Sequence, residues 1–255
     1  MKVSNIDNEG ANVKGTWLCR LLLVLFLPTL TSSPTLAQSE RIEEINGKVF
    51  LVLPDEEPPE NMIWGAFGEE IERYFGVPAY SNGAAEDGKR KYQCTELIHR
   101  FLRVVYGIPT RIGMGLGHGR DLAKGIAGRF GDSHQARGLI EGYIIHLEYF
   151  ENEKTAYPPV VGSIVSMHFN SRREGYGHVG IIRTMETHSD GSVSGFLFDQ
   201  HGAIHKTVGL SIKPDKVVFR KDDNGIWSAQ VESWKFKRYF PVIGWTNVVV
   251  QQRDR

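Results

Sequence analysis

The sequence predicts an α+β domain in which N-terminal helices pack on an antiparallel β-sheet. Two observations support this prediction. In the first half of the chain, apolar residues recur every three or four positions, which is typical of helices that cover a core. From residue 142 onward, short segments rich in β-branched and aromatic residues alternate with turn-forming residues. Helices followed by strands indicate an α+β architecture.

The region before residue 86 contains the first predicted elements. Residues 48–54 (KVFLVLP) predict a short strand, and the acidic, proline-containing residues 55–61 predict a linker. Apolar residues four positions apart over residues 63–75 predict a helix that ends at Gly76.

A second helix is predicted to begin at Cys94. Apolar residues follow this cysteine at i+3, i+4, i+7, i+8 and i+11, a close match to a helix with one face toward the core. Gly107 and Pro109 end the pattern. After a glycine-rich loop, Asp121 is positioned to cap a third helix that runs toward Phe130.

The second half of the chain supplies the predicted sheet. Its segments have the length and composition of strands and are bounded by turn residues such as those at 189–192. The strands are expected at residues 143–150, 161–169, 177–185, 195–200, 216–220 and 244–250.

Composition excludes some classes of protein. The chain has 255 residues, of which 41% are hydrophobic, enough for an ordinary core. Lys and Arg total 30, and Asp and Glu also total 30. This balance argues against a nucleic-acid partner, because proteins that bind nucleic acid usually carry a basic excess.

The N-terminus has the features of a secretory signal peptide. Lys14 and Arg20 precede the apolar residues 21–30, and small residues follow up to Ala37. The apolar run is shorter than the roughly 20 residues that span a membrane. We therefore expect a secreted, periplasmic or otherwise extracytoplasmic protein without stable membrane insertion after cleavage. An uncleaved anchor is the alternative.

Cleavage after Ala37 would leave a single cysteine. The chain has two cysteines, and Cys19 would be removed with the signal peptide. A disulfide-stabilised scaffold is then excluded, since such scaffolds need paired cysteines. The remaining Cys94 stands at the predicted start of a helix, where backbone N–H groups stabilise a thiolate. It also fits a small apolar residue on the inner face of that helix, and periodicity does not separate the two interpretations.

A reactive cysteine needs a partner, and His178 has the most suitable surroundings. The sequence GYGHVGII places it after small residues and at the start of an apolar strand, although a histidine there is also compatible with a structural role. Farther along, Asp199 and His201 in FLFDQHG point to one face of a strand. Either side chain is suited to accept the ring N–H of His178 and to fix its tautomer. The scattered histidines and the absence of HExxH or CxxC motifs predict no metal site.

Together these motifs resemble the CHAP family, the cysteine, histidine-dependent amidohydrolases/peptidases of the papain-like and NlpC-like superfamily. YQCTELIHRFL is similar to the family's helix with the nucleophile, and GYGHVGII is similar to its histidine strand. PPVVGSIVSMHF, FLFDQHG and VIGWT resemble its GDIV strand, its acidic strand and its final strand, in the family's order over residues 92–246. Ser163 stands where an aspartate is usual, and His201 stands where an asparagine is usual.

The resemblance implies a papain-like fold and the hydrolysis of an amide bond without a cofactor. Cys94, His178 and Asp199 would be the catalytic residues, with His201 as the alternative third residue. Tyr92 or Gln93 would bind the oxyanion or the substrate. For an exported member, the expected substrate is a cell-wall peptide or another amide. The alternatives are a glutathionylspermidine-type amidase and a catalytically silent secreted binding domain of the same fold.

These features predict three parts of the chain. Residues 1–37 form the signal peptide, residues 38–85 form an N-terminal extension with one helix, and residues 86–250 form the CHAP-like catalytic domain.

Overall fold

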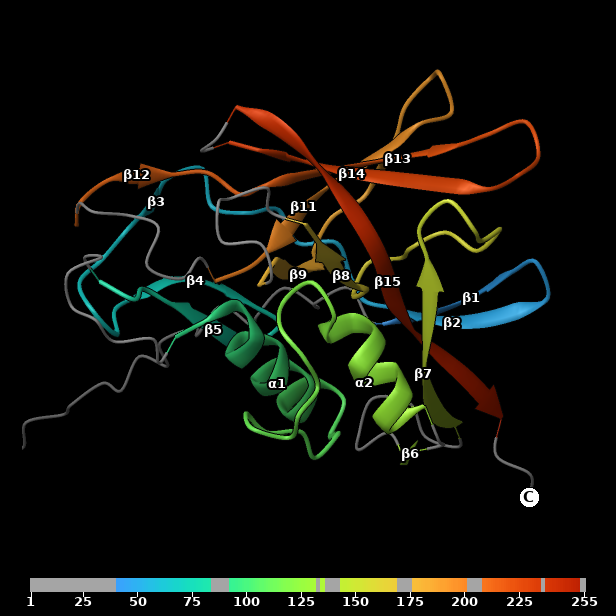
Figure 1. Ribbon diagram of the computed structural model, residues 1–255, viewed down its shortest axis with the longest axis horizontal. Coiled ribbons are helices and arrows are strands. Elements are labelled where there is room, and N and C mark those ends of the chain that lie inside the picture. Colours follow the sequence, from blue (N-terminus) through green and yellow to red (C-terminus); the bar gives the residue numbers. More distant parts are fainter. Residues whose placement is uncertain are drawn as a thin grey trace, which may run out of the picture. The chain divides into compact units, whose positions relative to one another are not determined.

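A ring of six antiparallel strands forms the centre of the computed structural model (Figure 1). The strands of the ring are β8 Ile164–Met167, β9 His178–Ile182, β11 Val193–Phe198, β13 Lys216–Lys221, β14 Trp227–Ser233 and β15 Arg238–Gln252. The order runs from β8 through β9, β11, β13 and β14 to β15, and β15 pairs with β8 again. These strands therefore close into a barrel within the described part of the chain.

The described residues all belong to one compact unit, Leu36–Arg255. They are residues 40–83, 92–131, 134–135, 143–168, 176–200, 208–234 and 237–252. The predicted signal peptide, residues 1–37, lies outside these ranges.

Within the described residues, five further strands extend the sheet beyond the ring. The added strands are β1 Arg41–Ile45, β2 Lys48–Val52, β6 His134–Gln135, β7 Tyr143–Glu151 and β10 Glu186–Thr187. β7 runs antiparallel to β15 over nine residue pairs, and β10 instead pairs with β11. Two small sheets lie apart from this one: β3 Met62–Ile63 pairs with β12 Ser211–Ile212, and β4 Glu70–Tyr74 pairs with β5 Val77–Tyr80.

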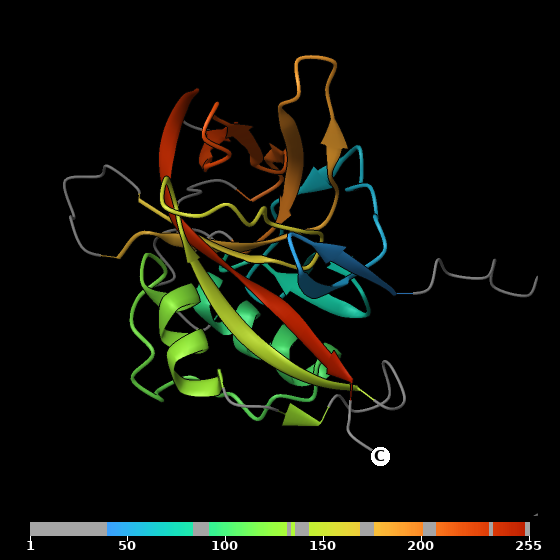
Figure 2. The ribbon, with the colours of Figure 1, turned by 90° about the vertical axis from the view of Figure 1, so that its right-hand side faces the viewer.

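The two helices of the described residues lie on the same side of the sheet (Figures 1 and 2). α1 spans Cys94–Val105 and contacts β9 and β5, and α2 spans Leu122–Phe130 and contacts β7, β15 and β8. The inner face of α1 is apolar and buried from Leu97 to Val105, which confirms the predicted helix and its core-facing stripe. In the described ranges, neither helix is long and apolar enough to span a membrane.

The predicted fold class is wrong. We expected an α+β, papain-like fold with N-terminal helices packed on an antiparallel sheet. The described residues instead form fifteen strands and two helices, and five of the strands precede α1. The sheet closes on itself through β15 rather than presenting one open face to a layer of helices. The protein is mostly β, although the antiparallel pairing was anticipated.

The helix predicted over residues 63–75 is also wrong, since this stretch contains β3 and β4. Four residues are also twice the two-residue period of a β-strand, so apolar side chains at this spacing share one face of a strand as well as of a helix. In β4 the buried residues Glu72 and Tyr74 alternate with the half-buried Ile71 and the exposed Arg73, as in a strand with one face covered. The segment then reverses at Phe75 and Gly76, both with positive φ (50° and 76°), which is the geometry of a tight β-hairpin turn.

Trp245 offers a test of the closed sheet. It lies on β15, is fully buried and packs edge-on against Phe219 of β13 with ring centroids 6.0 Å apart. Trp245→Ala should lower the free energy of unfolding by about 3–5 kcal/mol, because it leaves a cavity between strands of the ring. Urea denaturation followed by circular dichroism measures this change. The control Tyr239→Ala removes an exposed ring from the same strand and should change stability by less than about 0.5 kcal/mol. Equal losses in the two variants would contradict the packing described.

Candidate functional site

Cys94 is the first residue of α1, where the backbone changes from extended to helical. The preceding Gln93 has φ −97° and ψ 160°, so the chain enters the helix without a side-chain cap. The first turn of a helix presents backbone N–H groups that favour a negative charge. The thiol is half-buried, whereas the apolar stripe begins only at Leu97. Cys94 therefore lies at the edge of the core, within reach of solvent.

His178 and Asp199 come from two neighbouring strands. His178 begins β9, and Asp199 directly follows β11, which pairs antiparallel with β9. His178 Nε2 lies 2.9 Å from Asp199 Oδ2, a hydrogen-bond distance. Both side chains are 4% exposed, so water does not screen this pair. The structure thus brings together two residues that are 21 positions apart in the sequence.

Two opposing effects act on the pKa of His178. Burial lowers it, but the charges of Cys94 and Asp199 and hydrogen bonds to both side chains raise it, and the net pKa lies well above the ordinary value. Because Nε2 faces Asp199, Nδ1 is the ring nitrogen left for Cys94. The imidazole ring of His178 thus lies between the side chains of Cys94 and Asp199 and contacts both.

Gln200 connects the end of the acidic strand to the start of the nucleophile helix. Its side chain is fully buried. Its Nε2 donates to Gln93 O and to Glu96 Oε2, both at 3.2 Å. Its Oε1 accepts from the backbone N–H of Tyr80 at 2.7 Å and from Arg100 Nη2 at 3.2 Å. Because Gln200 follows Asp199, these bonds hold Asp199 in register with the first turn of α1.

Tyr92 and Gln93 lie immediately before the cysteine, as their place in the chain requires. The ring of Tyr92 packs on Phe67 and Tyr80, with centroids 5.2 and 5.0 Å apart, and its backbone N–H donates to Asn82 Oδ1 at 2.9 Å. The carbonyl of Gln93 accepts from Leu97 N at 3.2 Å, which starts the helix. Both residues therefore shape the entrance to α1, and their expected contacts with an oxyanion or a substrate stay predictions.

A loop from the glycine-rich segment packs against the start of β9. Arg120 N donates to Tyr176 O at 3.0 Å, and the rings of His118 and Tyr176 meet edge-on at 4.7 Å. Gly119 lies so close to His178 that an added Cβ would be 2.9 Å from its Cα. The absence of a side chain at Gly119 allows the loop to brace the backbone of His178.

Some predicted features fall outside the site as described. His201, the alternative third residue, lies in the undescribed residues 201–207. Within the ranges that the structure describes, no cluster of three or more His, Cys, Asp or Glu side chains is arranged to hold a metal ion.

Three buried residues near the site were not identified from the sequence: Gln200, Arg183 and Glu72. Gln200 stands inside the quoted motif FLFDQHG, so its position next to Asp199 was the available signal. Arg183 was visible only as a charge at the end of an apolar strand, and it is 1% exposed in the structure. Glu72 gave no such signal, because it belongs to a stretch that predicted a helix.

A comparison with protein families adds an independent observation to this geometry. Residues 84–195 match the model of the CHAP domain. The match identifies residues 84–195 as a CHAP domain. The match includes Cys94 and His178 and ends before Asp199. A search of curated proteins gave no match. CHAP domains are generally amidases or peptidases, so the match indicates a hydrolase of amide bonds.

The contact between this loop and His178 can be tested at Gly119. In Gly119→Ala the added Cβ would lie 2.9–3.1 Å from backbone atoms of His178, which have little freedom to move away. We expect the rate of Cys94 alkylation by iodoacetamide at pH 6.5 to fall about tenfold or more, because small displacements of reacting groups are costly. Gly128→Ala on α2 is the control, since its Cβ would meet no atom within 4 Å. An unchanged rate in Gly119→Ala would show that the loop does not brace His178.

The pKa of His178 provides a second test of the CHAP site. Replacing the thiol by a hydroxyl in Cys94→Ser removes the negative charge facing the ring but leaves the burial, which lowers the pKa. His178 should therefore lose its proton at a lower pH in Cys94→Ser than in the wild type, as followed by NMR of the imidazole ring. The control Gly128→Ala should titrate like the wild type. A histidine that titrates identically with and without Cys94 would contradict the ion pair.

Proposed function

We propose that the protein is a cysteine-dependent amidohydrolase or endopeptidase in which Cys94 is the nucleophile. The observation that carries this proposal is the chain of contacts from Cys94 through His178 to Asp199. A thiol at a helix start beside a histidine is the arrangement that cysteine hydrolases use. The CHAP match supports the reaction class, because its family hydrolyses amide bonds.

The geometry supports a two-step mechanism. The Cys94 thiolate attacks the carbonyl carbon of the amide, and the C–S bond forms as the carbonyl π electrons move to oxygen. The backbone N–H of Cys94 is suited to stabilise this oxyanion at the helix start. His178 then protonates the leaving nitrogen, and the C–N bond breaks to leave a thioester.

Hydrolysis of the thioester completes the cycle. His178, now neutral, accepts a proton from water, and the hydroxide attacks the thioester carbonyl. The C–S bond breaks, which releases the carboxylic acid and restores the thiolate beside the imidazolium. Asp199 holds the ring through Nε2 during both steps, so that Nδ1 stays directed toward Cys94.

The substrate proposed for this site is a cell-wall peptide, namely a stem peptide or a cross-bridge of peptidoglycan. The signal-like residues 14–37 support an extracytoplasmic location, where such peptides occur. Beside the cysteine, the half-buried rings of Tyr92, Phe67 and Tyr80 provide an aromatic surface for a peptide chain. Neither a cofactor nor nucleic acid has a part in this reaction.

Activity measurements on purified peptidoglycan test the proposal. The wild type should release new amino groups, and Cys94→Ala should reduce this release to background because the nucleophile is gone. His178→Ala should lower the rate by about 10²–10⁴-fold, which is the usual contribution of an acid–base group. The control His146→Ala removes a histidine that binds Gln251 on β15, far along the chain from the site, and should leave the rate unchanged.

Three other outcomes of these measurements would change the proposal. Undiminished release by Cys94→Ala would overturn the mechanism. A wild type that binds wall fragments without cleaving them would support a silent binding domain. Cleavage of glutathionylspermidine but not of wall peptides would replace the substrate and keep the mechanism.

A further inference from the structure

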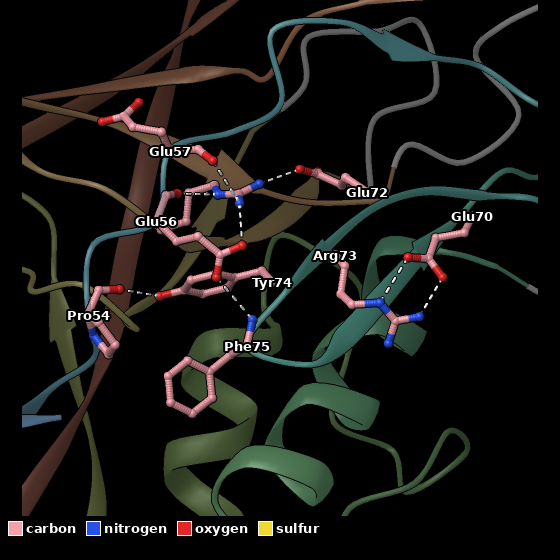
Figure 3. Close-up of polar contacts among 9 residues, drawn as sticks. Pro54, Glu56, Glu57, Glu70, Glu72, Arg73, Tyr74 and Phe75 are labelled. Carbon is pink, nitrogen blue, oxygen red and sulfur yellow. Dashed lines mark hydrogen bonds and ion pairs between the residues drawn. The ribbon is translucent and has the colours of Figure 1, made fainter. Parts of the chain in front are cut away.

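Glu72 is a buried carboxylate on the strand β4, which lies before the CHAP match. Its side chain is 3% exposed and forms an ion pair with Arg183, which is 1% exposed (Figure 3). Its carboxylate also accepts a hydrogen bond from the backbone N–H of Asp199. Burying a charged group is costly unless it is paired and hydrogen-bonded, and Glu72 meets both conditions. A side chain of the extension thus contacts the main chain of Asp199, the residue proposed to hold His178.

Arg183 in turn is held by the same extension. Its Nε donates to Glu56 O at 2.7 Å, and its Nη2 donates to Glu56 Oε1 and Glu57 O, both at 3.2 Å (Figure 3). Its guanidinium stacks over the ring of Tyr74 at 5.3 Å. Since Arg183 follows β9 directly, these contacts fix the end of the strand that begins with His178.

Burial raises the pKa of Glu72, while the facing guanidinium of Arg183 lowers it. An apolar side chain would fill the same space but would leave the N–H of Asp199 and the guanidinium of Arg183 without this acceptor.

Other residues of the extension reach the same region independently. The backbone N–H of Tyr80 donates to Gln200 at 2.7 Å. Asn82 bonds the backbone of Tyr92 in both directions. The extension therefore contacts the chain on both sides of the site, next to Cys94 and next to Asp199.

We propose that residues 40–83 are an integral part of the catalytic unit and that Glu72 is a positioning residue for Asp199. Glu72 acts through the backbone of Asp199 and so sets the direction of the carboxylate that holds His178. The proposal rests on the proposed roles of Cys94 and His178, but not on the identity of the substrate. It adds to the CHAP match a segment that the match does not cover.

The test uses the full chain with Glu72→Ala, Glu72→Gln and the control Glu70→Ala. Glu70 lies on the same strand and makes a largely exposed ion pair with Arg73, so its loss should have no effect (Figure 3). The readout is the rate of Cys94 alkylation by iodoacetamide at pH 6.5, which needs no substrate. We expect about a tenfold lower rate for Glu72→Ala, because misplaced reacting groups lose rate steeply. Glu72→Gln keeps one acceptor oxygen and should lose only about threefold.

A second readout separates positioning from substrate binding. On a peptide substrate that the wild type cleaves, Glu72→Ala should lower kcat and leave KM within about twofold, because Glu72 does not face the substrate. Thermal unfolding identifies the folded variants, and Glu72→Gln alone decides the matter if Glu72→Ala does not fold. A folded Glu72 variant that is less stable but is alkylated at the wild-type rate would overturn the proposal. Lowered alkylation without any amidase activity in the wild type would support the positioning role and reject the proposed function.

Discussion

The register between β9 and β11 is the constraint on which the site depends. Leu197 pairs with Ile182 and Phe198 with Ile181, so Asp199 comes opposite Gly180. Side chains two residues apart on a strand share a face, which places His178 diagonally beside Asp199. A slip of one residue would turn Asp199 to the other face of the sheet. Backbone hydrogen bonds, rather than the two side chains, therefore decide that the pair meets.

Several buried charged side chains lie beside β9 and β11, whose register aligns the site. Two buried ion pairs lie here: His178 at the start of β9 pairs with Asp199 after β11, and Arg183 after β9 pairs with Glu72 of β4. All four side chains are almost inaccessible to water. Isolated, each of these charges would cost several kcal/mol of folding free energy. Because these side chains are paired and hydrogen-bonded to the backbone, they favour one arrangement of the strand ends. Stability and reactivity thus depend on the same contacts.

The sequence allowed local features to be predicted better than the fold. The stripe from Leu97 onward predicted α1 correctly, because the 3.6-residue period extends over three turns. In residues 63–75 the period was misread, although Gly65 and Gly68 lie within the stretch and oppose a helix. The closure of the sheet was not predictable in this way, since it depends on β15 pairing with β8, about 75–80 residues earlier in the chain.

In the candidate site, too, local motifs were predictable and long-range contacts were not. The motifs around Cys94, His178 and Asp199 indicated which residues meet, through a resemblance carried by local sequence. Glu72 and Arg183 are 111 residues apart, and neither stands in a motif. Periodicity placed Glu72 within a predicted helix, whereas the structure has the strand β4 there. Contacts of this kind follow from the topology, which local patterns do not encode.

β15 comes last in sequence among the strands of the ring, which has a consequence for folding. This strand completes the ring between β14 and β8. It also pairs with β7 over Gly244–Gln252 and with β2 at Val249. During synthesis the ring stays open until residues 238–252 have left the ribosome, because no earlier strand takes their place in the sheet order. Long-range pairings of this sort form late and slowly. The nascent chain therefore contains the cysteine, the histidine and the aspartate well before the sheet that aligns them is complete, and the synthesis of β15 sets when the ring can close.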